Sequence, residues 1–128
     1  MIQANEVRRG NWIEYDNRFF QIDTIAEVFP TLDTGEFGIG VVDWNNIKPI
    51  ELTEEMLFKI KDIVQKEGSL GIYYYIKPYR MLRFFFDGTR LVIIKKDGDD
   101  IWIANIKYLH QLQNLYFVLT GKELELTL

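Results

Sequence analysis

The sequence predicts a single α+β domain over residues 1–128, with a subdomain break near 48–52 as the alternative. Three observations indicate this class. An apolar fraction of 48% is enough to build a core. Short β-like segments separated by turn residues fill the first third and the middle of the chain, and two other segments have helical periodicity. The expected order is an N-terminal strand-rich part, SH3-like or a small barrel, then a helix, an antiparallel meander, a second helix and a final strand.

The N-terminal part should contain four short strands. "NWIEY" and "RFFQI" flank Asp16-Asn17, two residues that tolerate the left-handed conformations of a tight hairpin. A third strand is expected at 24–29, then a surface loop in "PTLDTGEFG", then a fourth strand in "IGVVDW". Strands at this spacing favour a small, strongly bent sheet or an SH3-like barrel.

The segment "LTEEMLFKIKDIVQKEG" is predicted to form an amphipathic helix packed on a sheet. Thr53 can cap its first amides, and Gly68 is placed to end it. At 100° per residue, one face about 120° wide would carry the apolar side chains of Met56, Leu57, Ile60, Ile63 and Val64.

From residue 70 the pattern predicts an antiparallel meander of "LGIYYYI", "MLRFFF", "RLVII" and "IWI". A second helix over 106–120 follows, with Asn105 as its cap and Gly121 as its end. The closing "ELELTL" alternates leucine with polar residues, so it predicts a half-buried strand.

Composition narrows the chemistry. The chain has no cysteine and one histidine, which excludes thiolate metal sites and the usual zinc constellations, so we expect no metal and no cofactor. The net charge of −4 argues against a protein that simply coats nucleic acid. The start lacks a secretory pattern, and no apolar run is long enough to span a bilayer. We therefore expect a cytoplasmic protein without a membrane partner.

Three segments carry a resemblance. "RRGNWIEYDNRFFQI", "IKPIELTEEML" and above all "IKYLHQLQNLYFVLTGKELEL" resemble a group of small uncharacterised proteins of Bacteroidetes and of their phages and prophages. The resemblance covers both ends and the middle of the chain. It implies a host or phage-infected cytoplasm and no catalytic residues.

The last predicted helix offers a candidate protein-contact surface. Its apolar arc would contain Leu109, Leu112 and Leu115, and the opposite side would carry a polar strip of Lys107, His110, Gln111 and Asn114. Uncharged side chains that both donate and accept hydrogen bonds can be desolvated at an interface more cheaply than charged ones. The alternative is a solvated face that also bonds the protein's own loops.

A second candidate surface lies within residues 73–96. Residues 70–96 contain six basic side chains and one acidic one, whereas both flanking regions are acidic. Strand alternation places Tyr73 and Tyr75 on one face, near Lys77, Arg80 and Arg83, where rings could stack bases while cations hold phosphates. The alternative is an ordinary sheet surface whose cations lie over aromatic rings.

Three motifs predict no site. "RRGNW" lacks the glycines and lysine of a phosphate-binding loop, and "DTGEFGIG" lacks the paired fold of an aspartic protease. "KKDGDD" lacks the later glutamate of a calcium loop, so a hairpin turn is expected there.

Without a catalytic constellation, we expect a non-enzymatic accessory or protein-binding domain of mobile-element type, whose partner is another protein. A nucleic-acid-binding module using residues 73–96 is the alternative, and an enzyme comes third.

Overall fold

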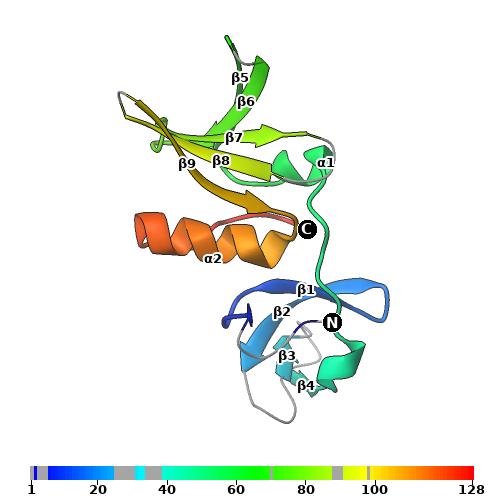
Figure 1. The fold of residues 1–128 in the computed structure, drawn as a ribbon. Helices are drawn as coiled ribbons and strands as arrows, with labels where there is room; N and C mark the ends of the chain where they lie inside the picture. Colours follow the sequence, from blue (N-terminus) through cyan, green and yellow to red (C-terminus); the bar gives the residue numbers. More distant parts are fainter. Residues whose placement is uncertain are drawn as a thin grey trace. The chain divides into compact units, whose positions relative to one another are not determined.

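The computed structural model describes residues 2, 6–24, 31–33, 39–69, 71–87, 91–97 and 99–128. Its contacts divide the chain into two compact units, drawn in Figure 1. Unit 1 contains Met1–Glu51 and Tyr108–Glu123, and unit 2 contains Leu52–Lys107 and Leu124–Leu128. Each unit is discontinuous in sequence, because the chain returns to unit 1 at Tyr108 and to unit 2 at Leu124. The secondary structure is mixed α+β, as predicted.

Unit 1 contains a four-stranded antiparallel sheet in the order β1-β2-β3-β4, formed by Trp12–Tyr15, Arg18–Thr24, Thr31–Asp33 and Ile39–Val41. The predicted hairpin is confirmed, since Tyr15 pairs with Arg18 and the turn residues Asp16 and Asn17 have φ values of 52° and 60°. Strand β3 occupies three residues of the expected surface loop. The strand expected at 24–29 lies almost wholly outside the described residues.

Closure of this sheet into a barrel is not confirmed. The described pairings join β1 to β2, β2 to β3 and β3 to β4, and they include none between β1 and β4. The pairing register between β2 and β3 shifts between Ile22 and Thr24. A local irregularity of this kind bends a strand. The described part is therefore a small irregular sheet.

The core of this unit gathers side chains from the sheet and from the segments beside it. Its buried cluster consists of Ile2, Val7, Ile13, Ile22, Leu32, Trp44 and Ile47. Trp44 belongs to a short 3-10 helix, η3 (Trp44–Asn46), which Asp43 caps by accepting a hydrogen bond from the Asn45 amide. The unit is completed by helix α2 (Leu109–Thr120). Gly121 ends α2 in the left-handed conformation at φ 73°, as predicted.

The predicted helix over "LTEEMLFKIKDIVQKEG" is wrong for most of its length. Helix α1 covers only Glu54–Leu57, with Thr53 as its cap, and strand β5 covers Ile63–Gly68. Asp62, at φ 63°, turns the chain between them. The apolar spacing fits a helix, but β5 pairs along its whole length with β6, and these non-local hydrogen bonds override the local pattern.

The predicted meander is confirmed and extended by one strand. Unit 2 has a five-stranded antiparallel sheet in the order β5-β6-β7-β8-β9, as Figure 1 shows from green to orange. The four later strands are Gly71–Ile76, Leu82–Phe86, Leu91–Asp97 and Asp99–Ile106. "KKDGDD" spans the β8–β9 hairpin, where Asp97 pairs with Asp99. This sheet is separate from that of unit 1.

The predicted final strand is reduced to one isolated bridge. Leu126 pairs with Ile60, and the Lys61 amide donates to the Glu125 carbonyl at 2.8 Å. Leu124 is buried, as the alternation indicates, but the segment pairs with the chain after α1 and not with a sheet. Because only one bridge forms, no strand is assigned there.

Candidate functional site

The predicted polar strip of α2 does not form one exposed surface. Lys107 lies before the helix and is exposed, and Gln111 is exposed while its side chain accepts a hydrogen bond from the Tyr108 amide at 3.1 Å. His110, by contrast, is only 2% exposed. Asn114 is half-buried and fully hydrogen-bonded inside unit 1. The four side chains therefore have different environments, and two of them serve the fold.

Asn114 links α2 to the N-terminal segment. Its side-chain oxygen accepts hydrogen bonds from Arg8 Nε at 3.0 Å and from Asn11 Nδ2 at 2.8 Å, and its amide nitrogen donates to the Glu6 carbonyl. The Arg8 guanidinium also makes a two-pronged contact with the Glu123 carboxylate, at 2.7 and 3.1 Å. Such bidentate pairs are geometrically specific, so this cluster fixes the approach of the N-terminal segment to α2.

Gln113, which the sequence did not single out, also links α2 to the N-terminal segment and is more deeply buried than Asn114. It is 1% exposed, its side-chain oxygen accepts from the Trp12 amide at 2.8 Å, and its nitrogen donates to the Gly10 carbonyl at 3.2 Å. Backbone groups at the start of β1 therefore find their partners on α2. The buried face of α2 therefore includes two polar residues that were not predicted there. It consists of Leu109, His110, Leu112, Gln113 and Tyr116.

The imidazole of His110 is enclosed. Its ring stacks on Tyr108 with 6.0 Å between centroids and 11° between planes, and within the described residues Nδ1 is buried without a hydrogen-bond partner. Burial lowers the pKa of His110 below 6.5, and the Glu6 carboxylate opposes this only in part. A neutral, enclosed imidazole is a poor candidate for a surface contact.

We expect the stability of the protein to fall as the pH decreases below 6.5. The lowered pKa of folded His110 means that the unfolded chain binds this proton more tightly, so the contribution is complete above pH 6.5 and is lost toward the folded pKa. Urea unfolding between pH 5 and 8 measures it. His110→Phe keeps an aromatic ring beside Tyr108 and should flatten this part of the profile; an unchanged profile would show that other groups cause it.

The second predicted surface is built on β6 and β7. Tyr73 is half-buried, and its ring lies 6.5 Å from Tyr75 and 5.8 Å from Phe85 between centroids. The Arg83 guanidinium lies over the Tyr73 ring at 4.3 Å. Tyr75, at 5% exposed, is part of the core and not a free ring as predicted. The structure thus assembles Tyr73, Phe85 and Arg83 into one stack.

Two further residues belong to this face and were missed by the sequence. Lys66 of β5 pairs directly with Tyr73, so its exposed side chain lies on the same face of the sheet. Gly68 ends β5, and a Cβ there would meet the Tyr73 ring at 3.0 Å. The glycine therefore leaves room for the ring. Once β5 is known to be a strand, alternation identifies both.

The remaining predicted cations lie at the end of β6. Lys77 and Arg80 are exposed in the turn that joins β6 to β7, where the Lys77 amide donates to the Asp62 carbonyl at 3.1 Å. Lys66 lies on the same face as the aromatic stack, and Arg83 is part of that stack. We call the set of Lys66, Tyr73, Lys77, Arg80, Arg83 and Phe85 the β6–β7 face.

Tyr74, which lies between Tyr73 and Tyr75 in the sequence, points to the opposite side of the sheet and is buried. Its hydroxyl donates to the Glu54 carboxylate at 2.6 Å, which ties β6 to the start of α1. Burial, and then the hydrogen bond and charge of Glu54, raise the pKa of Tyr74 to about 12. This contact holds β6 from the side opposite the β6–β7 face.

The described residues contain no cluster of three or more potential metal ligands. No helix in that part of the chain has the length and hydropathy needed to cross a membrane. The chain shows no significant match to any protein family, curated protein or solved structure. Functional inference therefore rests on the geometry of the two units.

Proposed function

We propose that the chain is a binding module whose β6–β7 face contacts single-stranded nucleic acid. The observation that carries this proposal is the stack of Arg83 on Tyr73 beside Phe85. Bases stack on aromatic rings and on guanidinium planes, and the Arg83 guanidinium lies 4.3 Å from the centroid of the half-buried Tyr73 ring.

The charges around the stack suit a single strand. Lys66 is exposed on the face of the stack, and Lys77 and Arg80 are exposed in the turn after β6, so the three cations could follow a phosphate backbone, although the whole chain carries a net charge of −4. Attraction of this kind is local, so binding should be moderate and strongly salt-dependent. If four cations contact phosphates, the slope of log affinity against log salt should be about −3.

Fluorescence anisotropy with a labelled single-stranded DNA tests the proposal. Tyr73→Leu should weaken binding about 5- to 150-fold, because one stacking contact is worth roughly 1–3 kcal/mol. Lys66→Gln should weaken binding less and lower the salt slope by about 0.7. Lys59→Gln removes an exposed cation outside this face and serves as the matched control. Absence of binding at low salt, or equal losses in all three variants, would overturn the proposal.

A protein-binding accessory domain of mobile-element type is the second candidate function. Its support is the outer side of α2, where Phe117, Val118 and Leu119 are 39%, 77% and 42% exposed. Consecutive exposed apolar side chains on a helix favour contact with another protein. The resemblance to Bacteroidetes and phage proteins, a cytoplasmic location and an SH3-like character of the N-terminal sheet belong to the same proposal.

Capture from a Bacteroidetes lysate, with and without nuclease, separates the two candidates. A protein partner should remain bound after nuclease treatment and be lost with Val118→Asp, whereas a nucleic acid should be lost with nuclease and with Tyr73→Leu. Nuclease-resistant capture that survives Val118→Asp would contradict the use of this helix surface.

A further inference from the structure

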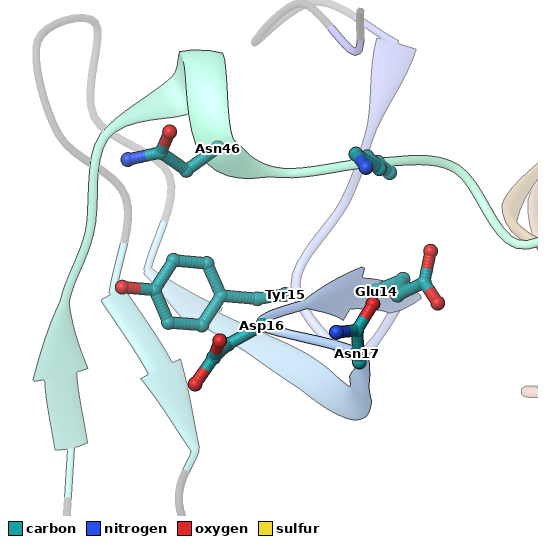
Figure 2. Close-up of a pocket in the computed structure, with 6 residues that line it drawn as sticks. Glu14, Tyr15, Asp16, Asn17 and Asn46 are labelled. Carbon is teal, nitrogen blue, oxygen red and sulfur yellow. The ribbon is translucent and has the colours of Figure 1, made fainter.

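Unit 1 contains a surface cleft of about 460 Å³ at the tip of the β1–β2 hairpin, shown in Figure 2. In that view the Asn46 amide comes from η3, and Tyr15, Asp16 and Asn17 come from the hairpin on the other side. The volume lies within the range of small-molecule clefts, about 300–1,000 Å³. The cleft is lined by Glu14, Tyr15, Asp16, Asn17, Asn46 and Lys48.

The walls of the cleft are held in place by the backbone. Glu14 and Lys48 exchange two amide-to-carbonyl hydrogen bonds, each 2.9 Å long, which join β1 to the chain after η3. The turn residues have the left-handed φ values of a tight hairpin, and the Asn46 amide donates to the Asp43 carbonyl at 3.0 Å. The lining side chains therefore start from fixed positions, which reduces the ordering cost of binding a ligand.

The lining carries charges of both signs together with uncharged amides. Glu14 and Asp16 would repel an anion, and Lys48 would oppose a cation. Among the described residues, the side chains of Glu14, Asn17 and Asn46 have no hydrogen-bond or ion-pair partner of their own. Carboxylates only accept hydrogen bonds, an ammonium only donates, and amides do both. Such a lining suits a neutral ligand with many groups that can both donate and accept hydrogen bonds.

We propose that this cleft binds a neutral carbohydrate of disaccharide size. Each sugar hydroxyl both donates and accepts, so one ligand can donate to Glu14 and Asp16 while it accepts from Lys48 and the two amides. Hydrogen bonds to the charged groups are the stronger ones. A single amino acid would leave much of the cleft empty. This site lies in unit 1 and is independent of the β6–β7 face.

The test is an NMR titration of the full-length, ¹⁵N-labelled protein with maltose, cellobiose and lactose. At least one disaccharide should shift the backbone amide signals of residues 14–17 and 46–48 in a saturable way. Asn46→Ala should weaken that binding about 3- to 10-fold, the usual value of one neutral hydrogen bond. Asn45→Ala removes the neighbouring exposed amide, which does not line the cleft, and should leave the affinity unchanged.

Three outcomes would overturn the proposal. The first is no saturable shift at these residues with any of the three sugars. The second is equal binding of glycylglycine, which would identify a site for zwitterions. The third is an equal effect of Asn45→Ala and Asn46→Ala, which would place binding elsewhere. Both side chains are exposed, so we expect both variants to fold, and thermal unfolding checks this.

Discussion

Gln113→Ala is expected to lower the free energy of unfolding by about 2–4 kcal/mol, because it leaves the half-buried Trp12 amide without its partner and opens a cavity at a buried position. The Trp12 amide donates to this side chain, which is 1% exposed, whereas the Gly10 carbonyl also accepts a hydrogen bond from Gln21 Nε2 at 2.9 Å. Removing a partner from a buried donor or acceptor costs its desolvation energy, and the deleted side chain also leaves a cavity.

Urea unfolding followed by tryptophan fluorescence measures this loss. Val118→Ala, on the same helix but 77% exposed, is the matched control and should change stability by less than about 0.5 kcal/mol. Equal effects of the two variants would show that Gln113 is not the link between α2 and β1. The comparison also tests the orientation of α2, since the predicted polar strip would place Gln113 away from the principal contacts.

Helix α2 shows which features a sequence can predict. Its end is determined locally, because Gly121 adopts the left-handed conformation and its amide donates to the Phe117 carbonyl at 2.8 Å. Its buried face depends on partners more than a hundred residues away, such as the segment from Glu6 to Trp12. The apolar pattern correctly placed Leu109 and Leu112 on the buried face, but it could not identify Gln113, which is buried because it bonds distant backbone groups.

In the two sheets, too, features set by neighbouring residues could be predicted, and features set by distant residues could not. The Asp16-Asn17 hairpin was predictable because both turn residues and both strands are adjacent in sequence. On β6, alternation correctly placed Tyr73 and Tyr75 on one face, but it could not show that Tyr75 is covered. The stack with Arg83 requires the pairing of β6 with β7, which no local pattern specifies. The cleft at the hairpin tip likewise requires η3 to return to β1.

Leu57→Ala should lower the free energy of unfolding by about 2–5 kcal/mol, the usual cost of truncating a fully buried leucine. Leu57 is 0% exposed and ends the single turn of α1. Val64→Thr should cost less than about 1 kcal/mol, because Val64 is half-buried on β5 and threonine keeps the β-branched shape that a strand favours.

This pair of variants decides between a strand and a helix after residue 62. In a continuous helix over "LTEEMLFKIKDIVQKEG", Leu57 and Val64 would share one buried face, and threonine would put a hydroxyl in place of a buried methyl there, at a cost of about 1–3 kcal/mol. Comparable losses in urea unfolding would therefore support the helix. A large loss for Leu57→Ala with a small one for Val64→Thr would support β5, and with it the placement of Lys66 and Gly68 beside Tyr73.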